Sequence, residues 1–402
     1  MMIPERPALE RRVLEALDVN GAGAGPAGGR IPVVLGGCGT GRTSLLLRLR
    51  DLLGRNAAQY VDVERIATTP ERFLSALRES SPFPSHASAV VNGNDHGPRE
   101  SFTAALSFLG QSRGTTGGPV TFLLDEFLEL RTFESFPGLR SVLRDLVGAL
   151  GSSQNRFVLT SRYTARAHRL LRDAPQRFEI LPVTPLTAAE VRTTLPASLD
   201  GRPSNLKVDE EDHARDDLGR LVHALSDGRP SYARMIAEAA TALGPRGAAD
   251  PVSALCALLA PGAPLAAACR YSYELRLHRA RGYGALKAIL EVLAEQEPLT
   301  LTEIALRLRR TPGSTKDYLS WLEDVDLITS RQKRYSFSDP LLRVWVRLHC
   351  RPTPPSDEDI AREVHTYVLG RLPQAEPDLA LAGARRAAGG GPEKSWGIIE
   401  ID

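Results

Sequence analysis

Residues 31–44 of the chain are IPVVLGGCGTGRTS, and this stretch decides the fold. The apolar run at 31–35 is typical of a strand that is buried on both faces, and a helix is expected over 44–53. Between them, GGCGTGRTS (residues 36–44) fits the spacing G-x-x-x-x-G-[basic]-[ST] of a loop that wraps around phosphate groups. A buried strand, a glycine-rich loop and a helix in this order predict an α/β fold with a parallel sheet between two helical layers.

Each part of this loop, called the P-loop below, has a physical purpose. Glycines at 36, 39 and 41 would let backbone amides turn inward, and the start of the next helix would add unpaired N–H groups and the positive end of its dipole. The hydroxyl of Thr43 would contact a Mg²⁺ ion that bridges the β- and γ-phosphates of ATP. A glycine-rich turn without a ligand is the alternative, since the basic residue is arginine. The candidate nucleotide-binding residues are Gly36, Gly37, Cys38, Gly39, Thr40, Gly41, Arg42, Thr43 and Ser44.

A second set of polar residues follows an apolar strand expected over 120–124. This strand is followed by Asp125 and Glu126. In a fold with a P-loop, the aspartate would hold Mg²⁺, often through water, and the glutamate would polarise the attacking water. The alternative is a solvated acidic turn.

The strand expected over 156–160 also ends in polar residues, Thr160-Ser161-Arg162. We expect it to lie beside the strand that carries Asp125. Thr160 could then orient the attacking water, and Arg162 could neutralise charge in the transition state. The alternative is an ordinary strand end.

Strands alternate with helices as far as residue 182, which predicts right-handed crossovers and a parallel sheet covered on both faces. The expected strands are 31–35, 59–63, 120–124, 156–160 and 178–181, and the expected helices are 5–17, 44–53, 70–77, 101–110, 138–150 and 165–171. Residues 80–99 lack periodicity and are expected to form a surface insertion.

The rest of the chain is expected to be helical apart from one hairpin. The expected helices are 187–194, 216–226, 231–243 and 251–260, with an acidic linker at 209–217; the basic stretch Arg270, Arg276, Arg279 and Arg281 is interpreted as a solvated helix face. Helices at 283–295, 302–309 and 314–323 and a hairpin at 327–337 predict a winged helix-turn-helix. We divide the chain into an N-terminal helix and linker (1–30), a core (31–182), a helical lid (183–282), a winged helix (283–350) and a C-terminal helix with a disordered tail (351–402).

The composition excludes several classes of protein. The 402 residues are 42% hydrophobic and 24% charged, with a net charge of +2, so neither a disordered chain nor a strong polycation is indicated. Four dispersed cysteines exclude a disulfide framework and a zinc ribbon, and no signal peptide or membrane span is recognisable. We therefore expect a cytoplasmic protein without membrane contact. Only five of the 50 basic residues are lysine, and none lies in the first 206 residues.

The order of the motifs resembles the STAND and archaeal-type ATPase branch of the AAA+ superfamily. The resemblance covers residues 5–350, and its more specific parts are T-S-R at 160–162, G-R-P at 228–230 and YSFSDPLLRVW at 335–345. It implies a P-loop NTPase core, a helical lid that contributes to the adenine pocket, and a switch driven by ATP binding and weak Mg²⁺-dependent hydrolysis. It also implies that Arg229 and Pro230, at the start of a lid helix, approach the nucleotide.

Arg42 departs from the family, which has lysine at this position. Arginine keeps the charge, but its planar fork is larger and stiffer. Two interpretations stay open: a working ATPase in which arginine replaced lysine, or a nucleotide-bound scaffold that does not hydrolyse ATP. The intact pair of Asp125 and Glu126 favours hydrolysis.

The winged helix raises the possibility of DNA binding, as part of an ATP-dependent regulator. Residues 283–349 carry ten basic and nine acidic side chains, and Arg331, Lys333 and Arg334 of the hairpin form a basic cluster. In the helix at 314–323, residues 318, 319, 321 and 322 resemble packing residues. We expect the domain to contact the core or a protein partner, with DNA as the weaker alternative.

Overall fold

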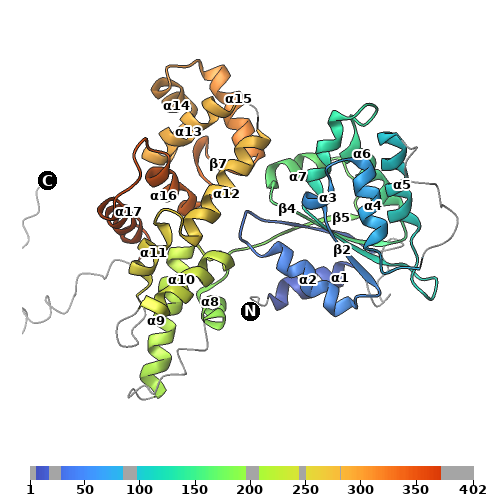
Figure 1. Cartoon of the computed structure of the whole chain (residues 1–402), viewed down its shortest axis with the longest axis horizontal. Coiled ribbons are helices and arrows are strands. Elements are labelled where there is room, and N and C mark those ends of the chain that lie inside the picture. The colour runs from blue at the N-terminus through green and yellow to red at the C-terminus, as the bar shows by residue number, and fades with distance from the viewer. Residues whose placement is uncertain are drawn as a thin grey trace, which may run out of the picture.

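A computed structural model describes residues 6–17, 29–84, 97–195, 208–243, 250–280 and 282–372. An α/β core occupies the right of Figure 1, and the helices that follow it in the chain occupy the left. The linker after the first helix, most of the expected insertion and the expected tail lie outside the described residues.

The core is built on one parallel sheet of five strands in the order β2-β3-β4-β1-β5. The strands are β1 (Ile31–Leu35), β2 (Ala58–Asp62), β3 (Thr121–Asp125), β4 (Arg156–Ser161) and β5 (Phe178–Pro182). The expected neighbourhood of β3 and β4 is confirmed, with Leu124 paired to Leu159. Because the strands are parallel, the residues that follow β1, β3 and β4 meet at one edge of the sheet.

Alternation along the strands sends side chains to two separate cores. On β1, Val33 packs with the cluster on one face of the sheet and Val34 with the cluster on the other. Helices α1 and α2 cover the smaller cluster, and α4, α5, α6 and α7 cover the larger one (Figure 1). The helices of the core are α1 (Pro7–Ala16), α2 (Arg42–Leu53), α3 (Val63–Ile66), α4 (Pro70–Glu79), α5 (Pro98–Gln111), the 3₁₀ helix η2 (Phe127–Ser135), α6 (Val142–Ser152) and α7 (Thr164–Leu171).

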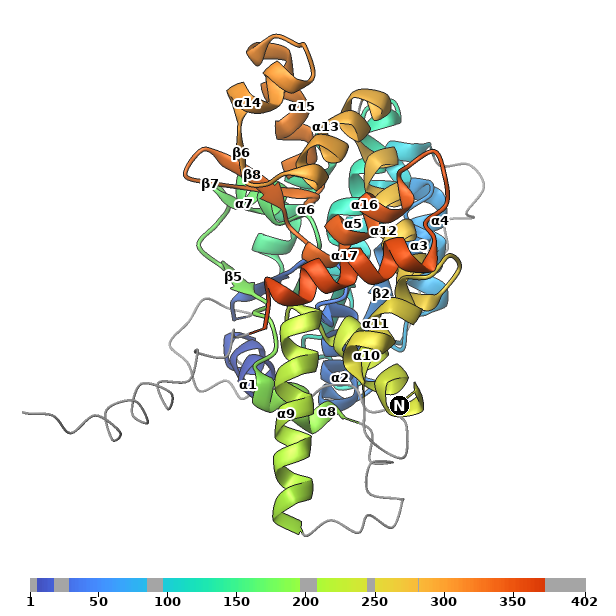
Figure 2. The ribbon, with the colours of Figure 1, turned by 90° about the vertical axis from the view of Figure 1, so that its left-hand side faces the viewer.

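The second half of the chain is a helical region followed by a winged helix (Figure 2). The helical region contains α8 (Ala188–Thr194), α9 (Val208–Ser226), α10 (Pro230–Leu243), α11 (Pro251–Leu259) and α12 (Pro264–Arg279). The winged helix contains α13 (Tyr283–Glu295), β6 (Leu299–Thr300), α14 (Leu301–Arg307), α15 (Pro312–Asp324), β7 (Ile328–Arg331), β8 (Arg334–Phe337) and α16 (Pro340–His349). Its three strands form an antiparallel sheet, and α17 (Asp357–Leu369) packs against both α11 and α16.

Two expectations about this half were wrong. The acidic segment 209–217 is part of helix α9, because Arg192 of α8 forms ion pairs with both Asp212 (3.0 Å) and Asp216 (2.7 Å) on one face of that helix. Arg276 is not on a solvated face: its side chain is only 1% exposed. The 3₁₀ helix η2 and the helices α3 and α16 were not expected.

Within the described residues, no single helix is long and apolar enough to cross a membrane. Helices α11 and α12, bent by 53° at the break between them, would meet the criterion together on length and composition alone. Their buried side chains, among them Leu255, Leu259 and Leu265, belong to the interior of the helical region.

Candidate functional site

The P-loop joins β1 to α2 through backbone conformations that glycine favours. Gly39 (φ 76°) and Gly41 (φ 90°) are left-handed, and a methyl group on Gly36 would come within 2.8 Å of Oγ1 of Thr40. Gly41 is the N-cap of α2, and no side chain caps this helix. The N–H groups at its first turn, which holds Thr43 and Ser44, are therefore open to an anion.

Asp125, at the end of β3, is where three hydroxyl groups converge. Oγ1 of Thr43 donates to its Oδ2 at 2.7 Å, and the hydroxyl of Tyr60 on β2 donates to the same oxygen at 3.0 Å. Oγ1 of Thr160 on β4 donates to its Oδ1. The structure thus brings together Thr43, Asp125 and Thr160 from three segments that lie far apart in the sequence.

Glu126 follows in a left-handed conformation (φ 55°) that turns its side chain into a buried cluster of charges. Its Oε1 accepts from Nη2 of Arg42 at 2.6 Å and lies 3.2 Å from Nε of Arg162, and its Oε2 accepts from the backbone N–H of Arg162 at 3.0 Å. Burial alone would raise the pKa of Glu126, but the two guanidinium groups outweigh burial and lower it. Glu126 is therefore an ionised carboxylate, and both its oxygens are engaged.

The side chain of Arg42 forms hydrogen bonds to several residues of the P-loop as well as to Glu126. Besides pairing with Glu126, its Nη1 donates to the carbonyl oxygens of Gly36 and Gly37 and, at 3.1 Å, to Oγ1 of Thr40. The side chain is buried, and its Nε has no hydrogen-bond partner within the part of the chain that the structure describes. In this conformation the guanidinium ties the loop to Glu126.

The start of lid helix α10 rests on the P-loop. Nη1 of Arg229 donates to the carbonyl of Cys38 at 2.9 Å, and its Nη2 donates to the carbonyl of Ser338 at 2.7 Å. Pro230 is the first residue of α10, and its Cγ would lie 3.8 Å from a methyl group on Gly41. The hydroxyl of Ser231 donates to the carbonyl of Gly39 at 3.3 Å. Arg229 and Pro230 thus both lie against the P-loop.

A second arginine reaches the P-loop from α12. The guanidinium of Arg276 lies beside the thiol of Cys38, and its Nη1 donates to the carbonyl of Asp326 at 2.6 Å. The carboxylate of Asp326 lies over the loop, since a methyl group on Gly37 would be 3.3 Å from it and 3.1 Å from Nη1 of Arg229. Both the lid and the winged helix therefore cover the P-loop.

Sequence reasoning missed four of these residues: Tyr60, Ser231, Arg276 and Asp326. Tyr60 was within reach of a topological argument, because β2 precedes β3 and strands close in sequence are often neighbours. Ser231 directly follows the G-R-P motif. No pattern indicated Arg276 or Asp326, because each depends on the way the winged helix rests on the core.

The cluster has the chemistry of a phosphate site. It offers open helix N–H groups, a hydroxyl and a carboxylate for a hard cation, and four buried or nearly buried guanidinium groups. Within the described residues no group of three or more His, Cys, Asp or Glu side chains is arranged to hold a metal ion by itself. A cation here would need ligands from a bound phosphate.

Comparisons with known proteins agree with this fold. No family model matches the sequence, and no curated protein matches it. Among solved structures, the Walker-type ATPase PABY2304 of Pyrococcus abyssi is similar, with a TM-score of 0.58 and 19% identity over 86% of this chain and 96% of that one. The Aeropyrum pernix Orc1 protein in complex with DNA (0.43, 18%, 92% and 95%) and Cdc6p of Pyrobaculum aerophilum (0.39, 13%, 92% and 97%) are similar at lower scores.

The similarity to the Pyrococcus protein extends over most of both chains. The chain has the fold of this archaeal Walker-type ATPase. The expected α/β P-loop fold, followed by a helical region and a winged helix, is therefore confirmed.

Proposed function

We propose that the chain is an ATP-binding switch of the AAA+/STAND kind that hydrolyses ATP slowly and passes its nucleotide state to the lid and the winged helix. One observation carries the proposal: the hydroxyl of Thr43 donates to the carboxylate of Asp125 at 2.7 Å, with Glu126 and Thr160 at the adjoining strand ends. This arrangement joins the P-loop to the two strands whose ends must act on a phosphate. It supports the roles proposed for these site residues.

The residues present fit Mg²⁺. A threonine hydroxyl and an aspartate carboxylate are hard oxygen ligands, and Mg²⁺ in nucleotide sites takes only one or two protein ligands besides water and phosphate oxygens. Thr43 and Asp125 would hold the ion, which neutralises charge that develops on the phosphates when bound. Tyr60, which shares Oδ2 of Asp125 with Thr43, would orient that carboxylate.

Hydrolysis needs Glu126 to be released from its present partners. As long as Arg42 and Arg162 hold both its oxygens, the carboxylate cannot accept a proton from water. Phosphates that enter the loop would compete for these guanidinium groups and free Glu126 to polarise a water molecule. Thr160 would help to orient this water, and Arg162 would face the charge that develops on the γ-phosphate. Slow turnover follows from a step that must break buried ion pairs.

The lid and the winged helix would sense the nucleotide through the three residues on the loop. Arg229 donates to the carbonyl of Cys38, and Arg276 lies beside the thiol of Cys38. Asp326 lies next to the position of Gly37. An incoming phosphate would attract the two arginines and repel the aspartate. Binding would therefore rearrange the contact between winged helix and core, which a protein partner could read.

The test is phosphate release from ATP with Mg²⁺, measured for the wild type and for Glu126→Gln. We expect the variant to bind ATP and to lose about 10²-fold or more in kcat, as is typical when a general base is removed. Glu79→Gln, at an exposed glutamate on α4, is the matched control and should turn over as the wild type does.

A non-hydrolysing scaffold is the second candidate, because Glu126 is held by two arginines in the described state. ATP binding without detectable phosphate release, unchanged in Glu126→Gln, would favour the scaffold and refute the enzyme. Absence of ATP binding would refute both.

A further inference from the structure

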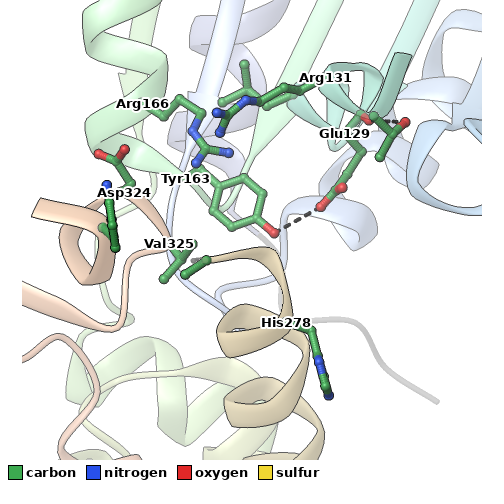
Figure 3. Close-up of a pocket in the computed structure, with 11 residues that line it drawn as sticks. Glu129, Arg131, Tyr163, Arg166, His278, Asp324 and Val325 are labelled. Atoms are coloured by element: carbon green, nitrogen blue, oxygen red, sulfur yellow. Dashed lines mark hydrogen bonds between the residues drawn. The ribbon is translucent and has the colours of Figure 1, made fainter. Parts of the chain in front are cut away.

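A cavity of about 500 Å³ lies between the core and the winged helix (Figure 3). None of the residues that line it belongs to the P-loop. The residues used below are Glu129, Arg131, Tyr163 and Arg166 from the core, and Trp321 and Asp324 from the winged helix. We call this space the interdomain cavity.

The inner wall of the interdomain cavity is a fixed aromatic ring. The hydroxyl of Tyr163 donates to Oε1 of Glu129 at 2.9 Å, and the two side chains are 1% and 4% exposed. Burial and the neighbouring Glu129 raise the pKa of Tyr163, so the hydroxyl stays protonated and keeps this bond. The half-buried indole of Trp321 lines the same cavity from the winged helix. The accessible aromatic surface of the cavity is therefore that of Trp321, because the ring of Tyr163 is covered by its neighbours.

Two guanidinium groups lie over this ring: that of Arg166 is 5.3 Å and that of Arg162 is 5.8 Å from the ring centroid of Tyr163. Figure 3 shows the guanidinium of Arg131 beside that of Arg166. Within the described residues Arg166 forms no ion pair. Burial and the charge of Arg131 lower the pKa of Arg166, and the opposing effect of Asp324 does not outweigh them.

The acidic residues of the interdomain cavity are already engaged. Glu129 accepts from Tyr163, and Asp324 forms an ion pair with Arg169, which does not line this cavity. Arg131 is also paired, with Glu134 at 3.3 Å, so within the described residues Arg166 is the arginine of the lining that forms no ion pair.

We propose that the interdomain cavity binds a small aromatic anion, in which a planar ring carries a phosphate or a carboxylate. The planar guanidinium fork of Arg166 matches the oxygens of both acidic groups, and the half-buried indole of Trp321 matches a flat apolar body. A volume of about 500 Å³ is in the range of small-ligand pockets, which often lie at domain boundaries.

A ligand bound in this cavity would affect the P-loop indirectly, through residues that are adjacent in sequence to the cavity lining. Tyr163 directly follows Arg162, whose backbone N–H holds Glu126, and Val325, which also lines the cavity, directly precedes Asp326 at the loop. A ligand that touches both walls would fix the winged helix on the core. The inference concerns a second site, and it does not depend on what the P-loop binds.

The test is calorimetric titration of the full chain with phenyl phosphate, benzoate and inorganic phosphate, with a non-hydrolysable ATP analogue present at high concentration to occupy the P-loop. We expect saturable binding of at least one aromatic anion and weaker binding of inorganic phosphate. Arg166→Met and Arg131→Met should each weaken the aromatic ligand about tenfold or more, since a hydrogen bond to a charged group contributes about 1.5–3 kcal/mol. Arg144→Met, at an exposed arginine of the adjacent hollow, should leave the affinity unchanged.

The head group is identified by whichever of phenyl phosphate and benzoate binds more tightly. Equal binding of inorganic phosphate and phenyl phosphate would overturn the aromatic part of the proposal. No saturable binding of any probe, or binding that survives both Arg166→Met and Arg131→Met in variants with the melting temperature of the wild type, would overturn it altogether.

Discussion

The basic residue of the P-loop, Arg42, forms an ion pair with Glu126 in addition to any contact with a phosphate. A lysine ammonium is a compact point charge, whereas the guanidinium fork can bond the loop carbonyls with one nitrogen and the glutamate with the other. Arg42 uses its fork in this way, and the carboxylate for which we propose a catalytic role is held in an ion pair in the described state.

Arg42→Lys should therefore keep the fold, and it should raise the rate of ATP hydrolysis or leave it unchanged, because lysine cannot hold the loop and Glu126 with two separate donors. Arg42→Ala should weaken ATP binding about tenfold or more through the loss of charge-assisted hydrogen bonds. Titration with a fluorescent ATP analogue measures the affinity of each variant, and a phosphate-release assay measures its rate of hydrolysis. If the alanine variant binds ATP as tightly as the wild type, Arg42 does not face the nucleotide.

The thiol of Cys38 should be the most reactive in the described chain. Burial acts to raise its pKa, but the guanidinium groups of Arg276 and Arg162 outweigh burial and lower it. Burial raises the pKa of Cys256, Cys269 and Cys350. A lower pKa means more thiolate at neutral pH, so iodoacetamide should modify Cys38 first, and its rate should level off at a lower pH than for an ordinary thiol.

Peptide mass spectrometry across a pH series measures this order directly. ATP should slow the modification of Cys38, because a nucleotide on the P-loop covers it. Faster labelling of Cys256 or Cys350 at pH 7 would contradict the electrostatic argument.

Among the helices, two begin with the same Asp-Pro pair but in different surroundings. Asp250 caps α11 and accepts from the N–H groups of Val252 and Ser253, both at 3.0 Å. Asp339 caps α16 at 3.1 and 3.2 Å, and it also accepts from the hydroxyl of Tyr232 at 2.8 Å and lies 3.6 Å from Arg229. The second cap therefore also ties the winged helix to the lid.

Asp250→Ala should lower the free energy of unfolding by about 1 kcal/mol, the usual value of a helix cap. Asp339→Ala should lower it by about 2–4 kcal/mol, because it also leaves the buried hydroxyl of Tyr232 without its acceptor and the charge of Arg229 without the carboxylate beside it. Urea titrations followed by circular dichroism give both values. Equal losses would mean that Asp339 acts only as a cap.

These elements also mark how far sequence reasoning reaches. The strands β1, β3 and β4 were predictable because each is a short apolar run that ends in glycine or polar residues, and their parallel order places Thr43, Asp125 and Thr160 together. Helix α9 was divided wrongly, because its acidic start looks like a linker until Arg192 is placed beside it. Arg276 was wrongly assigned to a solvated helix face, because the sequence of a basic helix does not indicate which distant segment covers it.

At the scale of the whole molecule, four segments converge on the P-loop. Besides Arg229, Arg276 and Asp326, Arg6 before α1 donates to the carbonyl of Thr40 at 3.4 Å. The winged helix is also attached to α7 through the ion pair of Asp324 and Arg169. In α15, Leu319 and Leu322 are fully buried, as expected of packing residues.

DNA should bind weakly to this arrangement. The exposed cations of the hairpin are Arg331, Lys333 and Arg334, and Arg334 already donates to the carbonyl of Pro298 at 3.2 Å. With three phosphate contacts from the hairpin, log affinity should fall with log salt with a slope of about −3, and binding should be weak at physiological salt. A mobility-shift titration over a salt series measures this.

Replacement of all three hairpin residues by alanine should remove the residual binding, and Lys316→Ala on α15 should not. Sub-micromolar, sequence-selective binding that the triple variant loses would instead identify the chain as a DNA-binding regulator.

The covered P-loop also has a kinetic consequence. A nucleotide cannot reach a loop on which Arg229, Ser231 and Asp326 rest until those contacts open, so the opening step precedes the encounter. In stopped-flow mixing, the observed association rate should then stop rising with ATP concentration and level off at the rate of opening. This plateau would be a property of the polypeptide alone, and a diphosphate and a triphosphate should share it although their affinities differ.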